Sequence, residues 1–282
     1  MIRPLSIALA SAMIAGAAMA QAPDAGWPER PIRLVVPFPA GSSTDIIARI
    51  IAQKLGHRVG QQIVIENRAG ASGNIGADAV AKAAPDGYTI GIATASTHAV
   101  AASLSANLPY DPIRDFAPVA MSGSQPYVLV LYPGLPVKNL AELIALAKAK
   151  PGTLNYGSAG VASLAHLATA LLASMAGVTL THVPYKSSAQ SVTDMMTGRL
   201  DMQFATIAPT LPNIQAGQLR ALVTSGRTRV AALPEVPTVA ESGIAGYEAA
   251  LWVSFVAPPA TPAAIVARLN REVNEILSSA EG

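Results

Sequence analysis

The sequence predicts an α/β protein in which largely parallel sheets are flanked by helices. Short runs of aliphatic and β-branched residues alternate with longer amphipathic stretches, and loops rich in glycine, proline and serine separate them. Hydrophobic residues make up 51% of the 282-residue chain and charged residues only 13%, and the mean hydropathy is +0.39. Such a composition can bury a large core and is the opposite of that of a disordered chain.

The amino-terminal third of the chain begins this alternation. A strand at Ile32–Val36 leads into the loop Pro37–Thr44 and then into a helix at Asp45–Leu55, whose isoleucines recur at helical spacing. Gly56 is expected to end that helix. A strand at 62–66, a glycine-rich turn at 70–76, a helix at 77–83 and a strand at 88–93 follow.

The rest of the chain repeats this order of elements. Asn139 and Glu142 have the spacing of a capping box and predict the start of a helix. Further helices are expected at 140–150, 161–176, 190–197, 210–216 and 263–277. Further strands are expected at 127–132, 154–156, 179–183, 202–205, 219–223 and 248–256, with an irregular Pro/Gly stretch at 233–246.

The first twenty residues have the features of a secretory signal peptide. Arg3 precedes a short apolar stretch at Leu5–Ala17, and Ala18–Ala20 fits the small-x-small pattern of a cleavage site. That stretch is shorter than the roughly 17–25 residues of a spanning helix, which favours cleavage over a membrane anchor. We therefore expect export of a mature chain that begins at Gln21.

Several function classes are disfavoured by the composition and the motifs. A net charge of +2 without runs of like charge argues against a nucleic-acid partner. The absence of cysteine and the wide spacing of the four histidines predict no metal, and no cofactor motif occurs. A hydrolase that uses Ser158 or Ser163 with His98 or His166 stays as an alternative.

Two strand-to-helix turns rich in small residues are the strongest candidates for a site. The first turn is Pro39–Asp45 and the second turn is Gly157–Ser163. Each is expected to expose unpaired backbone N–H groups at the positive end of a helix dipole, where small side chains let an anion approach. The alternative is that both are ordinary βα turns with capping residues.

A series of motifs around these turns resembles one known family. The motifs are WPERPIR at 27–33, PFPAGSSTDIIAR at 37–49, ENRAGASGNIG at 66–76, APDGYT at 84–89, YGSAGVASLAHL at 156–167, HVPYK at 182–186 and LPEVPTVAESG at 233–243. In order and spacing they resemble the Bug-type solute receptors of tripartite tricarboxylate transporters, which are periplasmic binding proteins. The resemblance spans Trp27–Asn274 and implies a two-lobed, Venus-flytrap fold of type II with the ligand between the lobes.

The resemblance also implies the residues of the site. A ligand carboxylate would lie between the two turns, held by N–H groups, hydroxyls and bridging water. Matched by position, the first turn would contribute Ala40, Ser42, Ser43, Thr44 and Asp45, and the second turn Ser158, Gly160, Ala162 and Ser163. A more variable, specificity-setting part would consist of Phe38, Ser96, Thr97, His98, Ala205 and Thr206.

The sequence leaves the roles of two residues undecided. Asp45 either caps its helix and ties the loop together or contacts the ligand. His166 lies one turn into its helix, and because helical side chains point toward the amino terminus it could brace the residues 157–160 from behind. Next to a positive helix end we expect its imidazole to be neutral at pH 7.

The chain departs from the family's usual pattern at a few positions. Ser42 and Ser187 stand where relatives usually have glycine, and Ala162 stands where glycine is common. A residue other than glycine is costly wherever the backbone needs a positive φ. The chain also ends at Gly282, where relatives usually continue, so we expect it to be short at this end.

These observations predict an exported, monomeric receptor that is not an enzyme. It would capture a di- or tricarboxylate, an acidic amino acid or an aromatic acid and present it to the large and small membrane subunits of a tripartite transporter. The expected lobes are residues 21–123 with 248–282, and residues 124–247. A ligand sensor that feeds a signalling partner is the further alternative.

Overall fold

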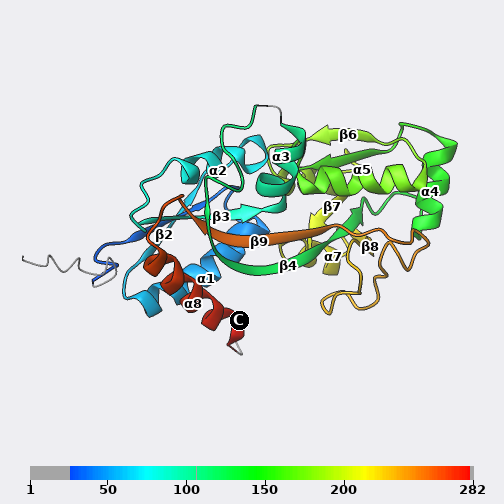
Figure 1. Ribbon diagram of the computed structural model, residues 1–282. Coiled ribbons are helices and arrows are strands. Elements are labelled where there is room, and N and C mark those ends of the chain that lie inside the picture. Colours follow the sequence, from blue (N-terminus) through cyan, green and yellow to red (C-terminus); the bar gives the residue numbers. More distant parts are fainter. Residues whose placement is uncertain (1–25, 106, 280–282) are drawn as a thin grey trace, which may run out of the picture.

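The computed structural model describes residues 26–105 and 107–279. The expected signal peptide at residues 1–20 lies outside this part of the chain. Within it, nine strands form one sheet: eight follow the order β2-β1-β3-β9-β4-β7-β5-β6, and β8 pairs with β4 off this path (Figure 1). The strands are β1 (Ile32–Val36), β2 (Ile63–Asn67), β3 (Thr89–Thr94), β4 (Ala117–Leu131), β5 (Asn155–Ser158), β6 (Thr181–Pro184), β7 (Met202–Thr206), β8 (Arg220–Thr224) and β9 (Ala250–Ala257).

Strands β4 and β9 join the two lobes of the molecule. The first lobe contains β1, β2, β3 and β9, the second contains β5, β6, β7 and β8, and β4 takes part in both. β4 pairs with β9 between Ala117 and Pro126 and with β7 between Tyr127 and Leu131. The two connecting strands run side by side across the middle of Figure 1. The lobe boundaries expected at 123/124 and 247/248 stay predictions.

The structure has the predicted α/β architecture, in which helices flank the sheet, and the sheet is mixed. β1 is parallel to β2 and β3, and β5 is parallel to β6 and β7. The pairs β3–β9, β4–β9, β4–β7 and β4–β8 are antiparallel. The reason is topological, because the chain crosses to the second lobe in β4 and returns in β9, and every antiparallel pair involves one of these crossing strands.

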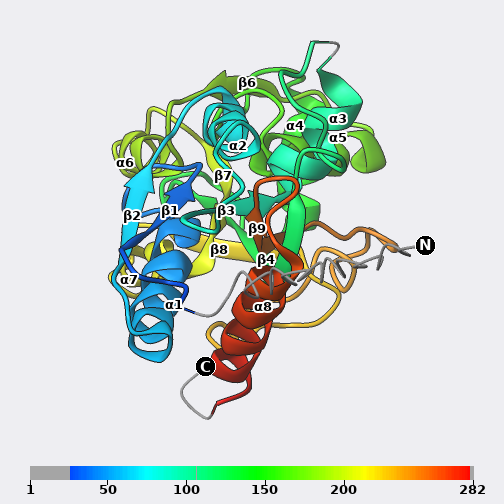
Figure 2. The same ribbon diagram turned by 60° about the vertical axis from the view of Figure 1, so that its left-hand side comes forward.

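Helices cover both faces of each lobe. They are α1 (Ser43–Val59), α2 (Asn74–Ala81), α3 (Ala101–Leu104), α4 (Leu140–Ala149), α5 (Leu164–Ala176), α6 (Ser188–Met196), α7 (Ile207–Gln215) and α8 (Ala263–Ser278), with short helical segments η1 (Ala71–Gly73) and η2 (Ala95–Val100). α1 and α8 lie side by side on one face of the first lobe (Figure 2), and α2 packs on the other face. In the second lobe α4 and α5 share one apolar cluster, whereas α6 and α7 share another.

The sequence pattern explains why these helices form, although one predicted end is wrong. In α8 the buried residues Ile265, Leu269, Val273 and Ile276 recur at spacings of three and four, which places them on one face. In α1 the helix continues through Gly56 and ends at Gly60, whose φ of 76° is left-handed and whose N–H donates to the Gly56 carbonyl. No helix in the described part of the chain is long and apolar enough to cross a membrane.

β4 begins ten residues earlier than the sequence predicts. Pro118, Gly123 and Pro126 interrupt the alternation of apolar residues, and these are the residue types that normally mark loops. The strand accommodates them through irregularities of register near Pro118/Ala120 and Met121/Gly123. The short helical segments η2 and α3 were also not predicted, because residues 95–104 carry no clear apolar period.

Candidate ligand-binding site

The parallel strands of the two lobes place several helix amino termini around one cleft. α1 and η2 begin where β1 and β3 end, and α5, α6 and α7 begin where β5, β6 and β7 end. Because the carboxyl ends of parallel strands meet at one edge of a sheet, these helix starts gather at the edges that face each other. A cavity of about 280 Å³ lies between them.

Residues of both lobes and of both connecting strands line this cavity. They are Phe38, Pro39, Ala40, Gly41, Ser42, Ser43, Thr44 and Ser96 of the first lobe, Tyr127 of β4, Leu251 of β9, and Ala159, Ser163, Leu164, Ala165, Ser187, Ser188, Ala189, Val192, Thr193, Met196, Thr206, Pro209, Thr210 and Asn213 of the second lobe. None of these residues is charged. A larger hollow of about 710 Å³ lies along the carboxy-terminal part of α1 and β2, where no helix begins.

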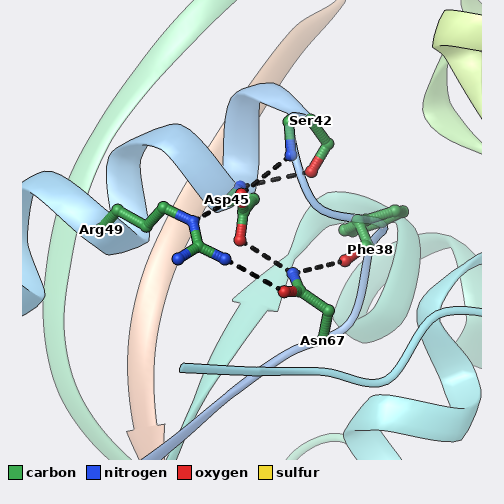
Figure 3. Close-up of polar contacts among 6 residues, drawn as sticks. Phe38, Ser42, Asp45, Arg49 and Asn67 are labelled. Atoms are coloured by element: carbon green, nitrogen blue, oxygen red, sulfur yellow. Dashed lines mark hydrogen bonds and ion pairs between the residues drawn. The ribbon is translucent and has the colours of Figure 1, made fainter. Parts of the chain in front are cut away.

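Asp45 ties the first turn together. Its carboxylate accepts hydrogen bonds from the Gly41 N–H at 2.9 Å, from Arg49 Nε at 2.9 Å and from Asn67 Nδ2 at 2.8 Å (Figure 3). Asn67 Nδ2 also donates to the Phe38 carbonyl at 3.0 Å. Burial raises the pKa of Asp45, but the hydrogen bonds from Arg49, Asn67 and Gly41 outweigh it and hold the pKa below its ordinary value.

This network leaves the start of α1 turned toward the cavity. Ser42 caps the helix, because its Oγ accepts the Asp45 N–H at 3.2 Å. The N–H groups of Ser43 and Thr44 have no partner inside the helix, as expected for a first helical turn, and both residues line the cavity. The Thr44 side chain is buried and makes no hydrogen bond within the described residues. These groups can therefore donate to an anion.

The second turn is held by its own serines. Ser163 caps α5 by accepting the His166 N–H at 3.3 Å, and its Oγ donates to the Gly160 carbonyl at 2.7 Å. Ser158 is fully buried, and its Oγ accepts the Gly160 N–H at 3.1 Å and lies 2.7 Å from His182 Nε2. The Ala165 N–H at the cavity is in the first turn of α5 and can also donate to an anion.

Two stacked histidines lie behind the second turn. The rings of His166 and His182 are 4.1 Å apart, and His166 Nδ1 accepts the Ala162 N–H at 3.2 Å. An accepting Nδ1 carries no proton, so this contact requires a neutral His166. Burial lowers the pKa of His166, and burial together with the neighbouring His166 lowers the pKa of His182 to about 4.

The sequence-predicted residues divide into three groups in the structure. Those that line the cavity are Phe38, Ala40, Ser42, Ser43, Thr44, Ser96, Ser163 and Thr206. Gly160 and Ala162 line a neighbouring hollow of about 1040 Å³, which shares part of its lining with the cavity. Those that line neither are Asp45, Thr97, His98, Ser158 and Ala205.

His98 is turned into the first lobe. Its ring lies 4.4 Å from that of Phe116 and 6.2 Å from that of Tyr110, and its Nδ1 is 2.9 Å from Thr97 Oγ1. Thr97 is fully buried and closes a capping box with Thr94. Of this segment, Ser96 is the residue that faces the cleft, and its Oγ accepts the Leu164 N–H from the other lobe at 3.0 Å.

The lining from α6 and α7 was missed by sequence reasoning. Ser187 caps α6 through the Gln190 N–H, which makes residues 184–188 a third strand-to-helix turn of the same kind as the first two. The Pro-Tyr-Lys-Ser-Ser sequence at this point was a usable signal. The residues farther along the two helices had no such sequence signal, because their exposure to the cavity depends on how α6 and α7 lie on the sheet.

The site has the chemistry of an uncharged anion receptor. It offers backbone N–H groups and hydroxyls from both lobes, and no group of three or more His, Cys, Asp or Glu side chains in the described part of the chain could hold a metal ion. Hydrogen bonds also join the lobes across the cleft, from Leu164 N to Ser96 Oγ and from Ser72 Oγ to the Val161 carbonyl. Gln125 of the connecting strand β4 donates from its Nε2 to Ser43 Oγ in the first turn of α1.

Comparison with known proteins identifies the family. The model of the tripartite tricarboxylate transporter family receptors matches residues 47–280. The chain belongs to this family. BugT of Bordetella pertussis is 41% identical over 254 residues, which are 90% of this chain and 78% of that protein. The predicted resemblance to Bug-type receptors is thereby confirmed.

Solved structures with the same architecture include receptors that hold carboxylates. The structure of R. palustris Rpa4515 with adipate is 41% identical with a TM-score of 0.88, covering 91% of this chain and 86% of that one. MatC from Rhodopseudomonas palustris with bound malate is 34% identical with a TM-score of 0.85, covering 90% and 87%. The two-lobed binding-protein fold is confirmed, as is the prediction that this tripartite transporter receptor is not an enzyme. The hydrolase alternative is therefore wrong.

Proposed function

We propose that this tripartite transporter receptor captures a small carboxylate in the cavity between its lobes and delivers it, as a monomer, to the large and small membrane subunits of the transporter. The observation that carries the proposal is the gathering of helix amino termini around an uncharged cavity. Partial positive charge at these termini attracts an anion, and the free N–H groups there fix its orientation. The carboxylates bound by the two solved relatives support the same ligand class.

Binding and lobe closure are coupled in this proposal. A carboxylate that accepts from Ser43 and Thr44 of α1 and from Ala165 of α5 touches both lobes at once. It therefore favours the state in which the lobes are close, since those contacts exist only there. β4 and β9, the two strands that connect the lobes, would carry the hinge.

The proposed location of the mature protein is the periplasm, which it reaches by export. The signal-peptide features of residues 1–20 support this location. Delivery is tested by uptake of the ligand into vesicles that contain both membrane subunits. Uptake should require the receptor, and uptake at the same rate without it would overturn the delivery step.

Thermal unfolding of residues 21–282 with a panel of mono-, di- and tricarboxylates tests the binding step. A ligand at a hundred times its Kd stabilises a protein by about 2.7 kcal/mol, or roughly 5–10 °C in Tm at this size. We expect at least one carboxylate to produce such a shift, and expect Thr44→Val to weaken it. Thr169→Val is the matched control, because Thr169 is buried in α5 and bonded to the Ala165 carbonyl. A folded protein that no carboxylate stabilises would contradict the proposal.

A further inference from the structure

The cavity extends away from the two turns along α6 and α7. Both helices begin at the cleft and pack on the same apolar cluster, which includes Val192 and Met195 of α6 and Ile207 of α7. On α6 the cavity is lined from Ser188 to Met196, eight residues apart, or about 12 Å along the helix axis. The space between the helices is therefore a groove that continues the carboxylate site.

The groove is lined by apolar and neutral side chains. Ala189, Val192 and Met196 of α6 and Pro209 of α7 present apolar surface, and Leu251 of β9 adds to it. The polar groups along the helices are the neutral side chains of Thr193, Thr210 and Asn213. Apolar surface contributes to affinity only when the ligand covers it, and a compact polar acid would leave it in contact with water.

The groove continues from the place that the proposed function gives to the carboxylate. There the carboxylate accepts from N–H groups of α1 and α5, and the rest of the ligand points into the groove between α6 and α7.

We infer that the ligand is a carboxylate with an elongated, apolar body that lies between α6 and α7, and not a compact polar acid such as malate or citrate. This inference rests on the proposed carboxylate-receptor function and specifies its substrate class. Hexanoate and adipate represent the expected class, and butanoate and succinate are their shorter counterparts.

Calorimetry with these acids, malate and citrate tests the inference on the parent chain. Within both the mono- and the dicarboxylate series the longer acid should bind roughly tenfold more tightly, because two more buried methylene groups contribute that much. Malate and citrate should bind more weakly than hexanoate. Equal affinity along each series, or tighter binding of malate or citrate, would overturn the inference and leave the proposed function intact.

A variant that fills the groove separates this inference from the function on which it rests. Thr193 is exposed at the far part of the groove, and Gln190 is exposed on α6 outside the cavity. Thr193→Phe should abolish the preference for hexanoate over butanoate while butanoate affinity is unchanged, and Gln190→Phe should behave as the parent. Retention of the full preference in Thr193→Phe would overturn the inference. If no carboxylate binds to the parent, the proposed function itself fails.

Discussion

At the scale of single residues, the departures from the family's glycine pattern fall on different backbone conformations. Ser42 has φ −67° and Ser187 has φ −151°, so neither position needs glycine, and both serines cap a helix instead. Ala162 has φ 63°, in the left-handed region that costs a residue with a β-carbon about 1–2 kcal/mol. The strain is thus confined to one of the three positions, beside the cleft.

Replacing this alanine by glycine should stabilise the protein. We expect Ala162→Gly to raise the free energy of unfolding by about 0.5–1 kcal/mol, because the relief of strain exceeds the greater freedom of glycine in the unfolded chain. Urea denaturation measures the change. Ala159→Gly in the same loop is the control and should lower stability, since Ala159 is not among the residues with positive φ. Equal losses in both variants would contradict the strain at Ala162.

Buried histidines make the fold sensitive to acid. Burial lowers the pKa of His98 from its ordinary value of 6.5 to about 4, so the unfolded chain takes up a proton at a pH where the folded protein does not. The contribution of His98 to the free energy of unfolding is fully present above pH 6.5 and is lost as the pH falls from 6.5 toward 4. We expect Tm to decrease over this range and expect His98→Leu to flatten the decrease.

The control for this pH dependence is His57→Gln, at an exposed position near the end of α1. It should leave the slope of Tm against pH unchanged. His182, whose pKa also falls to about 4, contributes in the same direction, so the slope in His98→Leu should be reduced and not absent. A slope identical to that of the parent would show that His98 takes up its proton equally in both states.

At the scale of elements, the second turn depends on the start of α5 and on β6 behind it. Loss of the His166 ring removes the acceptor of the Ala162 N–H and the stacking partner of His182. We expect His166→Ala to weaken carboxylate binding several-fold in calorimetry, since an amide left without its partner costs about 1 kcal/mol or more. His166→Asn should restore most of the affinity, because its side-chain oxygen can accept the same N–H. Equal binding by His166→Ala and the parent would exclude this positioning role.

The sequence predicted those elements whose sequence signals lie within a few neighbouring residues. The start of α4 at Asn139 and the turn before α1 depend on residues that are three positions apart, so both could be recognised in the sequence. The length of β4 was not, because Pro118 and Gly123 are tolerated only through pairing with β9, far away in the chain. The α6 and α7 lining was missed for a similar reason, since the packing of two helices on one face decides which side chains reach the cavity.

At the scale of the whole molecule, the contacts between lobes set how firmly a ligand is enclosed. Ser72 of η1 donates from its Oγ to the Val161 carbonyl across the cleft. Ser72 lines the neighbouring hollow of about 1040 Å³ but not the ligand cavity. This bond therefore stabilises the closed arrangement without touching the ligand. Ser96 and Gln125 also form hydrogen bonds at the cavity, with Leu164 and with Ser43. Ser96 lines the cavity, however, so its replacement would change ligand contacts as well.

Removing the Ser72 hydroxyl should release the ligand faster. One hydrogen bond contributes about 0.5–1.5 kcal/mol, so Ser72→Ala should raise the dissociation rate roughly two- to tenfold in stopped-flow displacement, with little change in the association rate. Ser103→Ala is the matched control, because the Ser103 hydroxyl bonds to the Ala99 carbonyl within its own lobe. If Ser72→Ala and Ser103→Ala release ligand at the parent's rate, the Ser72 contact does not hold the lobes together, and enclosure must depend on the ligand bridging α1 and α5.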